Sequence, residues 1–411
     1  MSQSKTPKIR FPEFTEDWQK KRLDEIFTER KESCIISEEY PQLAFTIAEG
    51  VINPEDKKTN KRDFLIKDIE TKKFAVTEVD DIIYNPANLK FGAIHRNKLK
   101  RGGVSPIYAI FSTEQLPAFM EYLVKRPSFI QESLKYLEGT VIKLMTLKPR
   151  DFLLMKTYIP SIPEQEKIAD LFTTLDSYIE IETKKTDSYK TLKASMLQKM
   201  LPQQGTSEPE IRFPGFTEPW EQRKLLEFGK ATGGTSIESE FSEDGIYKVI
   251  SIGSYSEDSV YRDQGIRAVR SDKTANRILN KGDITMILND KTASGNIIGR
   301  VLLIEESGVY VYNQRTERIE VDSSNYDSQF IYTMLNAPEI RDKIIKQSQG
   351  NTQIYVNWTT VSQTDYLVPQ LSEQRRIGEY FSNLDNLITL HQRKCDTLKE
   401  LKKGMLQKMF V

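Results

Sequence analysis

The chain repeats itself, and this repetition constrains its fold more than any other feature. The stretch IRFPEFTEDW at residues 9–18 recurs as IRFPGFTEPW at residues 211–220, with eight of ten residues identical. A longer repeat relates residues 160–201 to residues 369–410, and its MLQKM segment is the same in both copies. Internal repeats constrain the architecture before any local element does. We therefore expect two equivalent halves, each with a short motif, a variable segment and a long repeat.

Both long repeats have the pattern of a helix with a narrow apolar face. Apolar residues recur four and three positions apart, at Ile168, Phe172, Leu175 and Ile179 and again at Ile377, Phe381, Leu384 and Ile388. Such a seam is typical of helices that pack against a partner helix. Thirty-eight helical residues would extend ~57 Å, and Ser161 with Glu164 fits a capping box. The simplest arrangement packs the two long helices on each other; ordinary amphipathic helices inside two separate domains are the alternative.

The variable segments, about 28–159 and 230–368, share little sequence identity. Each has the length of one compact domain. Runs rich in branched and aromatic residues, bounded by turn signals, predict a mixed α/β structure. The predicted strands lie at 80–85, 105–111, 299–305 and 308–313, and the predicted helices at 114–125 and 326–347.

Charge and cysteine content exclude several classes of protein. Lys plus Arg and Asp plus Glu both total 59, so the net charge is zero and a globally basic nucleic-acid binder is excluded. Cys34 and Cys395 are the only cysteines, which excludes a disulfide framework. The first residues have no apolar signal core, and no stretch has the ~18 apolar residues of a spanning helix. We expect a soluble cytoplasmic protein.

No catalytic constellation emerges from the sequence, and no catalytic residue or metal site is predicted. The chain has no glycine-rich phosphate loop. His391 and Cys395 have the four-residue spacing of metal ligands on a helix. Both continue the apolar seam from Ile388, so we interpret them as packing residues.

Local positive charge is present in both variable segments. Lys and Arg can bind DNA phosphates, and Arg, Asn and Gln can also read base edges. Solvated loops with acidic neighbours in the fold are the alternative. The candidate DNA-binding residues are Lys57, Lys58, Arg62, Lys90, Arg96, Lys98 and Arg101 in the first segment, and Arg267, Arg270, Lys273, Arg277, Gln349, Asn351 and Gln353 in the second.

The whole pattern resembles the specificity subunits of type I restriction–modification enzymes. The resemblance covers essentially the full chain. It rests on the two IRFP motifs, on the helix starts IPEQEKIADLFTTLD and LSEQRRIGEYFSNLD, and on both MLQKM segments. GDITMILND with GNIIGRV, and GGVSPIYAIF, are similar to the target-recognition domains of that family.

This resemblance implies an α+β fold in which two mixed α/β target-recognition domains are joined by two long helices in an antiparallel coiled coil with pseudo-two-fold symmetry. The expected domains are recognition domain 1 (1–159), helix 1 (160–205), recognition domain 2 (206–368) and helix 2 (369–411). Each recognition domain would read one half of a bipartite DNA site, and the helix pair would set the gap. The repeated motif would brace each domain against the helices through Phe11, Pro12, Phe14 and Trp18 and through Phe213, Pro214, Phe216 and Trp220.

The resemblance also implies partners. Two modification subunits would methylate adenine with S-adenosylmethionine, and ATP-driven restriction subunits would translocate and cleave DNA. This chain itself would bind no cofactor, and Mg²⁺ would belong to the partner subunits. A DNA-independent scaffold, with two modules on a coiled coil, is the rival interpretation. An autonomous methyltransferase is disfavoured because its motifs are missing.

Overall fold

The computed structural model describes residues 6–57, 71–137, 146–203, 205–291, 294–351 and 353–411. The chain divides into two compact units. Unit 1 contains Met1–Thr183 and Arg393–Val411, and unit 2 contains Lys184–Gln392. Among the described residues, no helix combines the length and the apolarity needed to cross a membrane.

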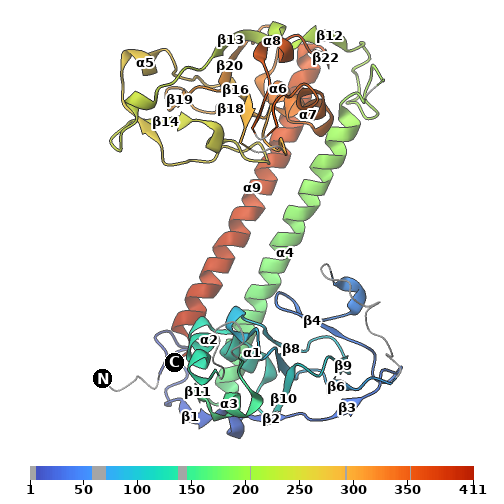
Figure 1. Cartoon of the computed structure of the whole chain (residues 1–411), viewed down its shortest axis with the longest axis vertical. Helices are drawn as coiled ribbons and strands as arrows, with labels where there is room; N and C mark the ends of the chain where they lie inside the picture. The colour runs from blue at the N-terminus through green and yellow to red at the C-terminus, as the bar shows by residue number, and fades with distance from the viewer. Residues whose placement is uncertain (1–5, 58–70, 138–145, 204, 292–293, 352) are drawn as a thin grey trace. The chain divides into compact units, whose positions relative to one another are not determined.

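Unit 1 contains a four-stranded sheet of order β2-β10-β7-β8. Strands β2, β8 and β10 of this sheet are labelled in Figure 1. A three-stranded sheet, β3-β6-β9, and the pairs β1-β11 and β4-β5 complete its strands. The strands are β1 Gln19–Arg22, β2 Phe27–Glu29, β3 Ser33–Cys34, β4 Ala44–Thr46, β5 Gly50–Ile52, β6 Phe74–Thr77, β7 Ile82–Tyr84, β8 Ile94–Arg96, β9 Gly102–Val104, β10 Ala109–Thr113 and β11 Lys156–Ile159. The short helices are α1 Pro117–Lys125, α2 Pro127–Ser133 and α3 Pro149–Leu154.

Unit 2 contains a four-stranded sheet of order β13-β20-β16-β18, with β15-β14-β19 and the pairs β12-β22 and β17-β21. Its strands are β12 Glu221–Lys224, β13 Gly229–Gly233, β14 Tyr247–Ile250, β15 Arg267–Ala268, β16 Ile284–Ile287, β17 Asn289–Asp290, β18 Val301–Leu303, β19 Tyr310–Tyr312, β20 Thr316–Val321, β21 Ile354–Tyr355 and β22 Asp365–Val368. Its short helices are α5 Asp272–Ala275, α6 Ser328–Leu335, α7 Pro338–Ile345 and α8 Trp358–Val361.

The two four-stranded sheets are equivalent although their sequences are not. In unit 1, Phe111 of β10 lies opposite Ile82 of β7. In unit 2, Ile319 of β20 lies opposite Ile284 of β16. Matching these pairs relates β10 to β20 with an offset of 208 residues. This register shows which side chains of the two variable segments hold the same structural position.

The two long helices, α4 (Ile162–Met200) and α9 (Leu371–Lys408), both pass from one unit into the other. Within each unit they run antiparallel, and an ion pair joins them. Asp176 of α4 binds Lys402 of α9 in unit 1. The equivalent residues Lys193 and Asp385 bind at 2.6 Å in unit 2. The duplication therefore extends to the contacts between the helices.

The apolar seam lies partly against the other long helix and partly against the domains. In unit 1, Phe172 contacts Phe410 just after α9, with ring centroids 6.0 Å apart, and also Tyr122 of α1 at 5.1 Å. Six seam residues are buried (Ile168, Phe172, Leu175, Ile377, Phe381, Leu384), and Ile179 and Ile388 are half-buried. His391 and Cys395 are buried on α9: the His391 ring stacks on Tyr189 at 5.5 Å, and Cys395 lies 3.3 Å from the Thr183 hydroxyl.

All the predicted strands and helices of the variable segments have somewhat different bounds in the structure, and two of them differ most. The helix predicted at 326–347 is two helices, α6 and α7, because Pro338 lacks the backbone N–H needed to continue the first. The strand predicted at 105–111 begins only at Ala109. Residues 105–108 form a turn in which the Tyr108 N–H donates to the Ser105 carbonyl at 3.2 Å.

Candidate nucleic-acid interface

The first short motif ties the end of one long helix to the start of the other. In unit 1, the Ile9 N–H donates to the Lys408 carbonyl at 3.0 Å, at the end of α9. The next residue, Arg10, donates two hydrogen bonds of 2.7 Å to the carboxylate of Glu164 in the first turn of α4. The indole N–H of Trp18 donates to the same carboxylate at 3.2 Å. Glu164 is almost fully buried, and its hydrogen bond is the main cause that raises the pKa of Arg10.

The second motif repeats this arrangement with the roles of the helices exchanged. The Ile211 N–H donates to the Lys199 carbonyl at the end of α4, at 2.8 Å. Arg212 binds the carboxylate of Glu373 in α9 at 2.7 and 2.8 Å. We call Arg10, Trp18 and Glu164 clamp 1, and Arg212, Trp220 and Glu373 clamp 2. The buried indole N–H of Trp220 has no hydrogen-bond partner among the described residues, which distinguishes clamp 2 from clamp 1.

A glutamine beside each clamp glutamate joins the long helix to the domain. The Gln165 amide accepts from the Leu116 N–H at the start of α1 at 3.1 Å and donates to the Pro160 carbonyl at 3.0 Å. Gln374 does the same in unit 2, accepting from the Asp327 N–H at the start of α6 at 2.9 Å. These contacts fix α1 on α4 and α6 on α9.

The predicted bracing residues differ in burial. Trp18 and Trp220 are buried, and each ring packs edge-on against a domain phenylalanine 6.1 Å away, Phe119 and Phe330 respectively. The phenylalanines of both motifs are half-buried, namely Phe11, Phe14, Phe213 and Phe216. Pro12 and Pro214 are exposed and contribute little burial to the brace.

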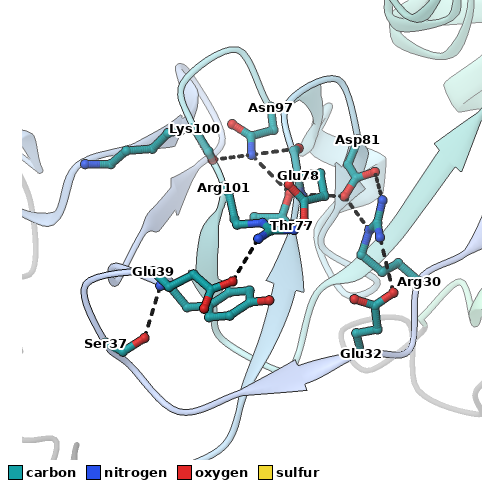
Figure 2. A network of polar contacts seen from close by, with 11 residues as sticks. Arg30, Glu32, Ser37, Glu39, Thr77, Glu78, Asp81, Asn97, Lys100 and Arg101 are labelled. Atoms are coloured by element: carbon teal, nitrogen blue, oxygen red, sulfur yellow. Dashed lines mark hydrogen bonds and ion pairs between the residues drawn. The ribbon is translucent and has the colours of Figure 1, made fainter.

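The basic run of the first variable segment is divided between the two ends of the sheet. Arg96 binds Asp80 at 2.9 Å, and Lys98 binds the buried Glu121 at 2.9 Å. Arg101 binds Glu78 at 2.7 Å and Glu39 at 3.0 Å, beside the Arg30–Asp81 pair (Figure 2). The Glu78 hydrogen bond is the main cause that raises the pKa of Arg101.

Those three cations are therefore matched by acids at the end of the sheet where β8 terminates. Lys90 lies instead in the loop between β7 and β8, at the opposite end, with its ammonium 5.3 Å from the centre of the Phe91 ring. Lys57 is half-buried. Lys58 and Arg62 lie outside the described residues.

The basic residues of the second segment are also largely engaged. Arg267 makes two 2.8 Å hydrogen bonds to Asp263, which are the main cause that raises its pKa. Lys273 binds Ser239 at 2.8 Å. Arg277 donates to the Gly233 carbonyl and to the Tyr312 hydroxyl. Arg270 is exposed and makes no ion pair with any residue that the structure describes.

The predicted glutamines and asparagine flank the short strand β21. Gln349 accepts a hydrogen bond from the Tyr355 hydroxyl at 3.0 Å, and Asn351 is exposed. Gln353 is exposed and lines a cavity of about 370 Å³. Of the three, Gln353 alone lines that cavity.

The same end of each sheet carries two loops that the strand register brings together. In unit 1 the Tyr84 end of β7 lies beside the Ala109 start of β10, so residues 85–93 and 105–108 adjoin. We call them loop edge 1. In unit 2 the end of β16 lies beside the start of β20, so residues 288–291, 294–300 and 313–315 adjoin. We call these loop edge 2.

The two loop edges present different chemistry. Loop edge 1 exposes the apolar side chains of Phe91 and Ile107, which are 64% and 61% exposed. Loop edge 2 exposes Lys291, Gln314 and Arg315, which line the 370 Å³ cavity. Ile107 and Arg315 both lie in the turn that precedes the equivalent strand, β10 and β20 respectively.

Comparison with known proteins agrees with this architecture. Residues 217–400 match the family described as the type I restriction modification DNA specificity domain. The specificity subunit of the type I restriction enzyme MjaVIII of Methanocaldococcus jannaschii is 22% identical over 407 residues, which is 95% of this chain and 91% of that protein. These matches show that this chain is similar to the specificity subunits of type I restriction–modification systems.

Solved structures show the same fold. The specificity subunit from M. genitalium superposes with a TM-score of 0.64 at 15% identity, covering 99% of each chain. A chain from a structure on complex assembly and conformational transition of a type I system superposes with a TM-score of 0.50 at 15% identity, covering 96% of this chain and 97% of that one. The predicted α+β fold with two mixed domains and two long helices is confirmed.

Sequence reasoning missed the charged residues that tie the short motifs to the long helices. Glu164 was expected in a capping box with Ser161, but its carboxylate binds Arg10 and Trp18 instead. The signal was present, because the Arg and the Glu recur in both copies at the offsets of their repeats. An isolated repeat gives no reason to pair residues about 150 positions apart.

Proposed function

We propose that this chain is the DNA-reading subunit of a type I restriction–modification complex in the cytoplasm, in which each recognition domain reads one half of a bipartite site. Similarity to these specificity subunits supports DNA sequence specificity and a non-catalytic role. The observation that carries the bipartite reading is the contrast between duplicated clamps and dissimilar loop edges. Equivalent clamps would hold two different DNA-reading domains in the same way on the long helices.

The chemistry of the complex belongs to partner subunits. Methylation of adenine with S-adenosylmethionine would occur on two modification subunits, and ATP-driven translocation and cleavage on restriction subunits. This chain supplies sequence recognition to both. Base edges in the major groove distinguish all four base pairs, so side chains on the loop edges suffice for that task.

The two long helices would set the gap between half-sites. Half-sites one helical turn apart lie about 34 Å from each other, and α4, with 39 residues, extends ~58 Å. Inserting four helical residues after Thr183 should add ~6 Å, which is less than two base pairs. Mapping of methylated adenines should then show a longer gap between unchanged half-sites. The same insertion in the turn 305–308 serves as a control and should leave the gap unchanged; an unchanged gap in both variants would disprove this role of the helices.

The duplicated helix surface offers two equivalent docking sites for modification subunits. Ile181 and Leu390 hold equivalent positions and are 46% and 47% exposed. Leu192 and Leu401 are likewise equivalent and are 38% and 49% exposed. Two copies of one partner need two copies of one surface, and exposed apolar side chains favour protein contacts. We propose that one modification subunit covers each surface.

Aspartate substitutions test this docking proposal by stoichiometry. Leu192→Asp should leave one modification subunit bound instead of two, and Leu192→Asp with Leu401→Asp should leave none, measured by mass of the purified complex. Thr191→Asp is the matched control, because Thr191 is exposed and lies about 100° around the helix from Leu192. Two bound subunits in the double variant would rule out these surfaces.

A further inference from the structure

Loop edge 2 lines part of a cavity in unit 2. Hydrogen bonds hold buried residues of the lining in place, and its exposed residues include a lysine and an arginine. The lining includes the buried Asn313, whose side chain accepts from the Ile237 N–H at 3.1 Å. It also includes the buried Asp290, whose carboxylate accepts from the Ile297 N–H at 3.0 Å. These bonds fix the β19–β20 turn and the loop after β16 on either side of the cavity. The cavity, about 370 Å³, is therefore bounded by two loops that the protein holds in place.

The exposed part of the cavity lining includes two cationic side chains. Arg267, Lys273 and Arg277 are engaged by other groups of unit 2. Lys291 and Arg315 are exposed and make no ion pair with any described residue. Two acids also line the cavity: Asp290 accepts from the Ile297 N–H, and Glu238 accepts from the Gln314 amide at 3.3 Å. The guanidinium of Arg315 and the ammonium of Lys291 thus lie beside an ordered polar cavity without an ion pair to a described residue.

The backbone of Arg315 adds an independent argument. Its φ is 69°, in the left-handed region that favours glycine. Its carbonyl accepts from the Leu288 N–H at 2.9 Å, which holds the turn in this conformation. A non-glycine residue kept in this conformation is typical of functional sites. Here the side chain it presents is an arginine at the mouth of the cavity.

We propose that Arg315 reads a guanine of the half-site recognised by unit 2, with its guanidinium donating to guanine O6 and N7 in the major groove. Arginine to guanine is the commonest specific base contact, since two donors match two acceptors. Lys291 then binds a flanking phosphate, which positions the domain without reading sequence. This inference rests on the proposed function and identifies one specificity-determining residue within it.

Arg315→Gly gives a clean test because glycine suits the backbone at this position. The variant removes the side chain and relieves the positive φ, so its thermal melting temperature should not fall. The complex with its modification subunits is used to select from randomised duplexes at fixed salt, and the bound DNA is sequenced. Arg270→Ala is the matched control, because it removes an exposed arginine of the same domain that makes no ion pair with a described residue. Exchanging residues 28–159 identifies the half-site that belongs to unit 2, because that half-site stays unchanged.

The expected result is a loss of about 10- to 100-fold preference for G·C at one position of the unit 2 half-site, with every other position unchanged. Arg270→Ala should change no position. A uniform weakening in Arg315→Gly, with all preferences kept, would make Arg315 a phosphate contact and overturn the inference. A change in the other half-site, or no change, would overturn it too. If the parent complex selects no sequence at all, the proposed function itself fails.

Discussion

The two clamps of this chain are alike, whereas its two loop edges differ. Clamp 1 and clamp 2 use the same residue types at the same offsets, with arginine–glutamate hydrogen bonds of 2.7–2.8 Å in both units. The loop edges adjoin equivalent strands, but the turn before β10 exposes Ile107 and the turn before β20 exposes Arg315. The arginine–glutamate pairs of the clamps are therefore duplicated, whereas the exposed side chains of the loop edges differ. A frame of this kind allows one half to change its surface without altering the other.

The comparison predicts its largest effect at the clamps. Glu164→Ala should lower the free energy of unfolding of unit 1 by about 3–5 kcal/mol, because Arg10 is left without its carboxylate and the Trp18 N–H without an acceptor. Urea denaturation followed by circular dichroism measures the loss.

Two controls decide whether this loss comes from the unpaired charge. Arg10→Met combined with Glu164→Met should be less damaging than Glu164→Ala alone, since no charge remains unpaired. Glu373→Ala should cost a similar amount in unit 2. If Glu373→Ala had no effect, the two clamps would not be equivalent.

A smaller effect is expected at Glu317, where the two sheets differ in their interiors. Glu317 holds the position of Ala109 and is 6% exposed, and burial raises its pKa to about 7. The folded state therefore favours the neutral acid, and its contribution to stability is complete below pH ~4.5 and is lost as the pH rises through 7. Glu317→Gln should stabilise unit 2 by about 1–2 kcal/mol at pH 8 and by almost nothing at pH 4.5. Melting temperatures across this pH range test it; an equal shift at both pH values would contradict the assignment.

The smallest effect concerns a packing difference beside the clamps. Leu201 holds the position of Phe410, whose ring packs 6.1 Å from Trp18 and 5.4 Å from Phe119. In unit 2 the shorter side chain borders a cavity of about 480 Å³, also lined by Trp220 and Met334. Leu201→Phe should add about 0.5–2 kcal/mol to the stability of unit 2 by filling part of this space. Phe410→Leu should act in the opposite direction in unit 1, and the same sign for both variants would refute the equivalence.

The sequence predicted what depends on periodicity and repetition. The long helices, the two mixed domains and the duplicated frame follow from apolar spacing and from residues that recur at a fixed offset. Pro338 ended a helix that periodicity had extended, because the apolar pattern continues across the break.

The candidate DNA-binding residues were harder to place, because charge in sequence says nothing about partners in space. The run 90–101 contains no acid, yet Asp80, Glu121 and Glu78 neutralise three of its cations from other segments. Gln353 was singled out from composition and does line the cavity of loop edge 2. Arg315 was not, since a single arginine in a turn carries no pattern. Its place beside the cavity together with its backbone dihedral angle distinguishes it.

If the clamps and long helices work independently of the DNA-reading loop edges, exchange of one variable segment should change only what that segment reads. Residues 28–159 are replaced by the corresponding segment of another family member, and methylated adenines are mapped genome-wide in cells that also carry the modification subunits. We predict a bipartite site in which one half changes while the other half and the gap stay as in the parent. A change in both halves, or in the gap, would contradict the account.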